Sequence, residues 1–209
     1  MNGKCLDFMI FAEKMKFEKL PQQGKVVALL RTFKGKSFVT QHVDKMSLTL
    51  AGIPGDRHSG FHKSAGVREQ NLYKKGTPVA NHRQWSALSV EELREIAEAM
   101  ELEQVEPSHL GANMLFEGIP NLTKLPPFTR IRIGKNPYIA TLVVYEENLP
   151  CKFPQEEMEQ AGVNVDGKAF AAAAKGKRGL VGWVEKGARI NVGDPVQVLV
   201  PIWAKSFDI

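Results

Sequence analysis

The chain has 209 residues, of which 43% are hydrophobic and 24% charged, and these are the proportions of a globular protein with a buried core. Its net charge of +5 favours anionic ligands, but no nucleic-acid-binding motif accompanies its clustered basic residues, so we expect no nucleic-acid partner. The apolar run at residues 8–12 is far shorter than a membrane span, so we expect a cytoplasmic protein with no signal peptide and no membrane partner.

The first part of the chain alternates between strand patterns and polar segments. Residues 1–23 are predicted to form an N-terminal extension with a weak helical pattern that Pro21 ends. Glycine-rich residues 52–66 and a polar connection at residues 67–82 follow later. Alternating apolar positions predict strands at residues 25–33, 46–50 and 84–88.

A helix is predicted to begin at Ser89, because Ser89-x-x-Glu92 matches the capping box, in which each side chain satisfies a free backbone N–H. Its buried face is predicted from helical spacing: Val90, Leu93, Ala97 and Met100. Residues 111–117 are predicted to form a strand or an extended loop. Further strands are predicted at residues 130–133, 138–145, 180–185, 189–192 and 195–200, with helical segments at 155–161 and 169–175. Many short strands with few helices favour a mainly β fold, an antiparallel barrel with helical additions.

The stretch GIPGDRHSGFHKSAG at residues 52–66 is the first candidate site. His58 and His62 have the spacing of two ligands on a helix, but Gly60 between them makes a helix improbable, so we expect no zinc. An anion site is the alternative, with Arg57 and His58 as donors, Asp56 orienting one of them, and Gly55 bringing backbone N–H groups close. A tight turn held by an Asp–Arg pair explains the same residues equally well.

The two cysteines, Cys5 and Cys151, lie far apart, and a reducing compartment argues against a disulfide between them. Cys5 is predicted to pack in the apolar N-terminal run. Cys151 lies in NLPCKFP, where Pro150 and Pro154 constrain a loop that presents the thiol beside Lys152. A nearby cation stabilises the reactive thiolate, although an unreactive loop cysteine fits the same pattern.

Taken together, these segments resemble the MOSC domain family, named after the C-terminal domain of molybdenum cofactor sulfurase. The resemblance extends from about residue 24 to about residue 200 and suggests a division into an extension (1–23), a MOSC domain (24–200) and a tail (201–209). Five ordered blocks carry it: Gly52-x-x-Gly55-Asp56-Arg57-His58-x-Gly60, Arg83-Gln84-x-Ser86-x-x-Ser89, Leu110-Gly111-Ala112-Asn113, Pro150-Cys151, and Arg178-Gly179-x-x-Gly182 followed by Gly187 and Val192-Gly193-Asp194-x-Val196.

The resemblance implies a MOSC-type β-barrel surrounded by short helices and a role in handling sulfur or the molybdenum cofactor. Cys151 falls where the family places its functional cysteine, which carries a persulfide or, in amidoxime-reducing members, ligates molybdenum. The remaining implied binding residues line an anion-binding cleft: Gly55, Asp56, Arg57, His58, Arg83, Ser86, Asn113 and Arg178. A cysteine desulfurase or a molybdoenzyme is the implied protein partner.

Two features separate this chain from the family pattern. Ala112 replaces the usual glutamate of the Leu-Gly-Glu-Asn element. The chain also lacks room for the pyridoxal-phosphate-dependent sulfurase module of larger members, so a stand-alone bacterial type is expected. Three functions stay open: a molybdenum-cofactor-binding protein, a metal-free sulfur carrier, and a non-catalytic module for an anionic, phosphorylated small molecule.

Overall fold

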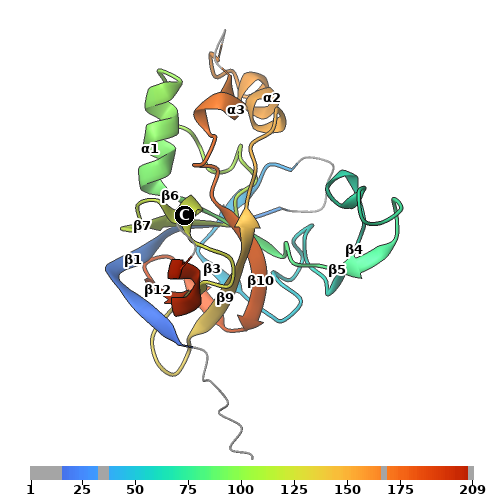
Figure 1. Ribbon diagram of the computed structural model, residues 1–209. Helices are drawn as coiled ribbons and strands as arrows, with labels where there is room; N and C mark the ends of the chain where they lie inside the picture. The colour runs from blue at the N-terminus through green and yellow to red at the C-terminus, as the bar shows by residue number, and fades with distance from the viewer. Residues whose placement is uncertain (1–15, 33–37, 166–168, 207–209) are drawn as a thin grey trace, which may run out of the picture.

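The computed structural model describes residues 16–32, 38–165 and 169–206. Within these residues the chain folds around a β-barrel, in the centre of Figure 1, with helices gathered at its upper end. Seven of the described strands form the barrel wall: β1 (Phe17–Arg31), β6 (Trp85–Ser89), β7 (Met114–Glu117), β8 (Arg130–Ile133), β9 (Ala140–Glu147), β10 (Leu180–Lys186) and β12 (Pro195–Pro201).

The strands follow the order β12-β8-β9-β10-β6-β7-β1, and the pairing of β12 with β1 closes the barrel. The barrel is mixed, because β6 and β7 run parallel while the other neighbours run antiparallel. Helix α1 (Val90–Ala99) lies in the connection between β6 and β7, and such a crossover is what a parallel pair requires. The mainly β barrel with helical additions is confirmed, and the expectation that all its strands run antiparallel is wrong for this pair.

Strand alternation fills the barrel interior. In β8, Ile131 and Ile133 are fully buried, whereas Arg130 and Arg132 are only partly covered. Trp85, Phe116 and side chains from the other wall strands complete this core. A second apolar cluster lies between α1, α2 (Phe153–Gln160) and α3 (Phe170–Ala173), and Met158 and Phe170 are among its buried members. The helices therefore cap one end of the barrel with a core of their own.

The remaining elements are short. Strand β2 (Gln41–Val43) pairs with β1, and β3 (Lys45–Ser47) pairs with β11 (Arg189–Asn191). Strands β4 (His62–Ser64) and β5 (Pro78–Ala80) pair with each other and project to the right in Figure 1, with the 3-10 helix η1 (Val67–Glu69) between them. Two further 3-10 helices complete the described residues: η2 (Leu122–Lys124) and η3 (Ile202–Ser206).

The helical pattern predicted before Pro21 is wrong for residues 17–23, because β1 begins at Phe17 and pairs with β12 from there. The register of this pairing shifts between Lys19 and Gln23, so Pro21, which has no N–H to donate, lies at an irregularity of the strand. Cys5 and the rest of residues 1–15 lie outside the described residues. At the other end of the chain, Ile202 N donates to Lys16 O, which joins η3 to the start of β1.

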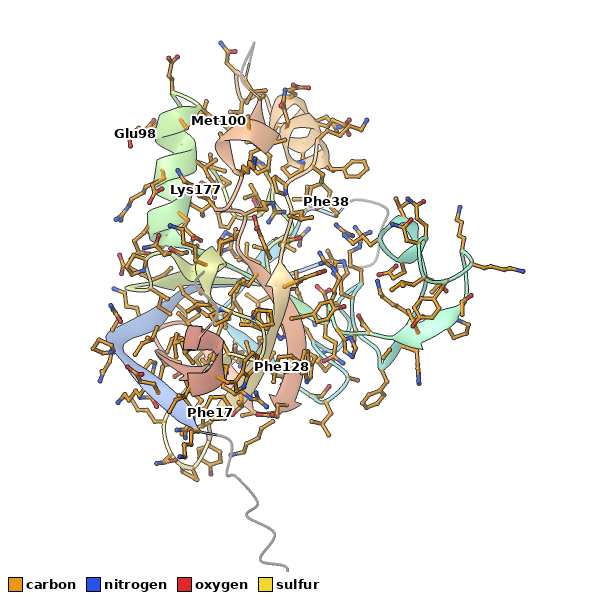
Figure 2. All side chains as sticks on the ribbon, in the orientation of Figure 1. Phe17, Phe38, Glu98, Met100, Phe128 and Lys177 are labelled. Atoms are coloured by element: carbon orange, nitrogen blue, oxygen red, sulfur yellow. The ribbon has the colours of Figure 1, made fainter. Side chains whose placement is uncertain are left out.

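Ser89 begins α1 as predicted, since its Oγ accepts from the backbone N of Glu92. The reciprocal half of the capping box is absent among the described contacts, because the Glu92 carboxylate bonds Thr123 instead. Leu93, Ala97 and Met100 are buried as predicted, and Val90 is only partly buried. Figure 2 shows Glu98 on the outer side of this helix.

None of the helices in residues 16–32, 38–165 and 169–206 combines the length and the apolar character that a membrane crossing requires.

Candidate functional site

Asp56 is a buried hydrogen-bond acceptor beneath the glycine-rich loop. Its Oδ2 accepts from Thr32 N at 2.9 Å, Thr32 Oγ1 at 3.0 Å and Asn113 Nδ2 at 3.1 Å. Its Oδ1 accepts from His58 N at 2.9 Å and lies 3.3 Å from His58 Nδ1. Burial raises the pKa of this carboxyl, but the hydrogen bonds from His58 and Thr32 outweigh burial and hold the pKa well below its usual range. Asp56 therefore stays ionised and ties the loop to the end of β1.

Asn113 extends this network across the barrel wall. Its Nδ2 donates to Leu30 O and to Asp56, and its Oδ1 accepts from Ser86 N at 3.0 Å and Ser86 Oγ at 3.3 Å. All these contacts are internal to the protein, and Asn113 is 1% exposed. The polar atoms of three residues expected to bind a ligand, Asp56, Asn113 and Ser86, thus form hydrogen bonds that hold β1, β6 and the loop together.

Arg57 and His58 lie at the surface of the same loop. Arg57 N donates to Thr32 Oγ1, and the Arg57 side chain is exposed without a hydrogen bond or an ion pair to any part of the chain that the structure describes. Asp56 orients His58, one of its two expected partners, and the alternative of a turn held by an Asp–Arg pair is wrong. Gly55 has a φ of +80°, a conformation that glycine adopts without strain and that lets the loop turn here.

Arg178, just before β10, is the most unusual charged side chain in the described structure. It is 5% exposed, and its Nη2 donates to Leu110 O. Within the described residues its Nε and Nη1 are buried and have no hydrogen-bond partner. A buried cation with unused donors is costly unless an anion or a further acceptor joins it.

Cys151 and two other arginines lie within electrostatic range of Arg178. Burial lowers the pKa of Arg178 to about 10, a Cys151 thiolate raises it, and the charges of Arg83 and Arg68 lower it further. Cys151 is a free, half-buried thiol in the loop after β9. Of the sequence-predicted site residues, Cys151 and Arg83 thus interact electrostatically with Arg178, and Arg68 is a further member of this group.

Arg83 is held by the end of β9 and by the loop that carries Cys151. Its Nη1 donates to Glu146 Oε1 at 2.5 Å and its Nη2 donates to Asn148 Oδ1 at 2.9 Å. Burial lowers the pKa of Arg83, and Arg68 adds to this effect, while Glu146 opposes it. The side chain is 13% exposed, so this guanidinium is a second partly buried cation near Cys151.

The Asp56 network and the Cys151 group are joined through residues 110–113. Arg178 donates to Leu110 O, Ser86 Oγ shares its one proton between Gly111 O and Asn113 Oδ1, and Asn113 follows Gly111 by two residues. No contact among the described residues places the Arg57 or His58 side chain against Cys151. Ala112, the departure from the family pattern, is fully buried in the apolar cluster beneath the helices.

A hollow of about 210 Å³ lies between the β4–β5 hairpin and the barrel. Tyr73 belongs to its hairpin side, and His82, Arg83 and Tyr145 belong to its barrel side. Arg83 is the sequence-predicted site residue among those that line it. No group of three or more His, Cys, Asp or Glu side chains that could hold a metal ion occurs in the described part of the chain.

Sequence reasoning missed Arg68 and Asn148. Arg68 lies in η1, inside the segment expected to be a plain polar connection, and no local motif marks it. Asn148 lies three residues before Cys151, and its side-chain bond to Arg83 spans 65 residues. The position of Asn148 close to the candidate cysteine was the signal in the sequence that could have marked it as a site residue.

The comparisons with known proteins point in one direction. The family model described as MOSC domain matches residues 74–197. A curated Bacillus subtilis protein, named "Putative metal-sulfur cluster biosynthesis proteins YuaD", is 39% identical over 165 residues, which cover 78% of this chain and 84% of the relative.

Solved structures agree with this assignment. The crystal structure of YuaD from Bacillus subtilis superposes with a TM-score of 0.80 at 36% identity and covers 88% of this chain and 99% of its own. YiiM from Escherichia coli shares the fold alone, with a TM-score of 0.54 at 17% identity, over 85% of this chain and 71% of its own. The mixed β-barrel, the family match and the similarity to YuaD together show that the chain belongs to the MOSC domain family.

Proposed function

We propose that this protein is a sulfur carrier in which Cys151 accepts sulfane sulfur beside a group of three arginines, Arg178, Arg83 and Arg68. The buried Arg178 guanidinium, with two nitrogen atoms that lack partners in the described structure, is the observation that carries the proposal. Such a cation gains most from an anion that arrives next to it. A thiolate or persulfide anion at Cys151 has the charge that this site lacks.

The chemistry at Cys151 is thiol exchange. The Cys151 thiolate attacks the outer sulfur of a donor persulfide, R–S–SH, and forms the new S–S bond while the donor S–S bond breaks. The donor leaves as the thiolate R–S⁻, and the transferred sulfur keeps its proton or releases it to solvent. Reversing the exchange on an acceptor thiolate returns Cys151 to its starting state. A cysteine desulfurase is the proposed donor, and a molybdoenzyme partner is the proposed recipient.

The same residues suit the molybdenum cofactor that the family name implies. Cys151 offers a soft thiolate of the kind that suits a transition metal, and Arg178 and Arg83 offer donors for a terminal phosphate. When bound, the cofactor supplies a metal centre that holds sulfur or oxygen. The role of the protein residues is to bind and orient it, and no pyridoxal phosphate site is needed for that role.

Binding of an anionic small molecule without sulfur chemistry is the second candidate. It is favoured by the unused donors of Arg178, which suit phosphate as well as a thiolate. Phosphate at a hundred times its Kd should then stabilise the fold by about 2.7 kcal/mol. In this case Cys151→Ser keeps the stabilisation and Arg178→Met loses it.

Mass spectrometry after incubation with an active cysteine desulfurase and cysteine tests the carrier proposal. We expect one added sulfur atom on the Cys151 peptide, lost on treatment with a reducing agent. Cys5→Ser should keep this adduct and Cys151→Ser should lose it. Absence of the adduct from the wild-type protein, with desulfurase turnover demonstrated in the same tube, would rule the proposal out.

A further inference from the structure

Glu92 is a buried carboxylate that the proposed chemistry does not use. It is the third residue of α1 and is 3% exposed. Its Oε1 accepts from Thr123 N at 2.9 Å, and its Oε2 accepts from Thr123 Oγ1 at 2.8 Å. No ion pair to Glu92 occurs among the described residues, so this carboxylate is satisfied by Thr123 of η2 instead of by a cation.

Thr123 carries the contact onward to the residue beside Arg178. The Thr123 hydroxyl donates its proton to Glu92. The lone pairs of Thr123 Oγ1 remain available, and this oxygen accepts from Gly179 N at 2.8 Å. An ionised acceptor polarises the hydroxyl and strengthens its bond to Gly179. Gly179 has a φ of +78°, and a Cβ there would lie 2.0 Å from Ala87 O, so its backbone is pressed against β6.

The peptide groups of Gly179 connect to the cysteine loop as well. Gly179 O accepts from Asn148 N at 2.8 Å, and Asn148 Oδ1 accepts from Arg83. Gly179 is thus fixed on its N–H by Thr123 and on its carbonyl by Asn148. Hydrogen bonds therefore lead from α1 through Thr123, Gly179 and Asn148 to Arg83 and to the loop that presents Cys151, and Arg178 is the chain neighbour of Gly179.

We propose that Glu92 and Thr123 are positioning residues that hold Arg178 against Cys151 through the backbone of Gly179. The arrangement explains why a carboxylate is buried here without a cation, since its role is to orient one hydroxyl proton. The proposal deepens the proposed function, because Arg178 matters only if Cys151 reacts beside it. Figure 2 shows Lys177, the residue before Arg178, alongside α1, where it pairs with Glu95 at 2.8 Å.

Two other carboxylates of α1 act on the ionisation of Glu92. Glu91 and Glu95 of α1 disfavour its ionised form, and burial does so more strongly, which raises the pKa of Glu92 to about 7. Lys124 follows Thr123 in η2, and Lys177 and Arg178 precede β10. Protonation of Glu92 reverses the donor direction at Thr123 Oγ1, and the bond to Gly179 then loses its polarised acceptor.

Alkylation of Cys151 by two probes tests the proposal without a sulfur donor. In a Cys5→Ser background, the rate ratio of anionic iodoacetate to neutral iodoacetamide measures how well Arg178 faces the thiol. The same rate ratio measured in Arg178→Met gives the reference value for a thiol without that cation. Thr123→Val should lower the wild-type ratio by roughly fivefold toward this value, while Thr123→Ser should restore it.

Thr129→Val is the matched control, because Thr129 is also fully buried and its hydroxyl has no hydrogen-bond partner in the described residues. It should leave the ratio unchanged. Glu92→Gln serves if Thr123→Val does not fold, and it should remove the change of the ratio with pH around neutrality. The proposal would be overturned if folded Thr123→Val kept the wild-type rate ratio, or if Thr129→Val lowered the ratio as much as Thr123→Val does. It would also be overturned if the ratio in Glu92→Gln changed with pH as it does in the wild type. Because no persulfide is involved, sulfur transfer can fail while the positioning result stands, and the reverse also holds.

Discussion

The Asp56 network and the Cys151 group are joined through residues 110–113, and they differ in how completely their buried polar atoms are hydrogen-bonded. The Asp56 network saturates its buried atoms, since Asp56 and Asn113 bond Thr32, Leu30, Ser86 and one another. The Cys151 group leaves two buried nitrogen atoms of Arg178 without partners in the described structure. A saturated network stabilises the fold, whereas unused buried donors beside a thiol carry an energetic cost that a nearby anion would reduce. The difference separates residues that build the site from residues that act in it.

The largest effect is expected from Asp56→Ala. The change leaves donors of Thr32 and Asn113 unsatisfied in the interior, which should lower the free energy of unfolding by roughly 3 to 5 kcal/mol. Urea denaturation measures it. Arg57→Ala, on the next residue but at the surface, should stay within about 0.5 kcal/mol of the wild type. A loss below about 1 kcal/mol for Asp56→Ala would mean that the network is not structural.

Glu92→Gln should change the pH dependence of stability. Burial raises the pKa of Glu92 in the folded protein to about 7, above the ordinary glutamate value of 4.5, so between these values the native state binds more protons than the unfolded state. Stability from this group is therefore present below pH 4.5 and is lost as the pH rises through 7, by about 3 kcal/mol in total.

Denaturation at several pH values from 4.5 to 8 should show this decline in the wild type and a flatter curve in Glu92→Gln. Glu98→Gln is the control and should keep the wild-type slope, because Glu98 is exposed near the end of α1 and is not among the groups that shift the pKa of Glu92. Identical slopes for the wild type and Glu92→Gln would contradict the assignment.

Arg178→Met should have the opposite sign from Asp56→Ala. It replaces a poorly satisfied buried cation by an apolar side chain of similar length, which should leave stability unchanged or raise it by roughly 1 to 3 kcal/mol. Thermal and urea unfolding measure this. A large destabilisation would show that Arg178 is part of the structural network, and the contrast between the two regions would disappear.

The smallest effect is expected from Arg57→Met on the rise in Tm that added phosphate causes. The exposed Arg57 lies outside the Cys151 group as the described contacts define it, so its loss should leave the phosphate-induced rise in Tm within about 1 °C of the wild type. A loss of that rise would move the anion site to the glycine-rich loop.

The strands were the part of the fold that local patterns could predict. In β8 and β12 burial alternates residue by residue, so the sequence period carries the information directly. Residues 17–23 were missed because Pro21 reads as an end of an element, whereas tertiary pairing with β12 continues the strand past it. The capping box failed in half for the same reason, since Thr123, 31 residues away, competes successfully for Glu92.

Local patterns pointed to the glycine-rich loop and to Cys151, and the family resemblance added Arg83, Ser86, Asn113 and Arg178. Cys151 and Arg178 are brought close by the antiparallel pairing of β9 with β10, which no short pattern reveals. Asp56 and Asn113 occur in the matching blocks, but their saturated hydrogen bonds emerge only in three dimensions. Arg68 carries no motif, because long-range electrostatic contact leaves no periodic signal in the sequence.

The rate of sulfur uptake by Cys151 in Arg178→Met, compared with Arg57→Met, tests the central idea most directly. With an active desulfurase in excess, loss of the buried guanidinium should slow persulfide formation roughly tenfold or more, while loss of the exposed one should leave the rate near that of the unaltered protein. Equal rates in the two variants would contradict it.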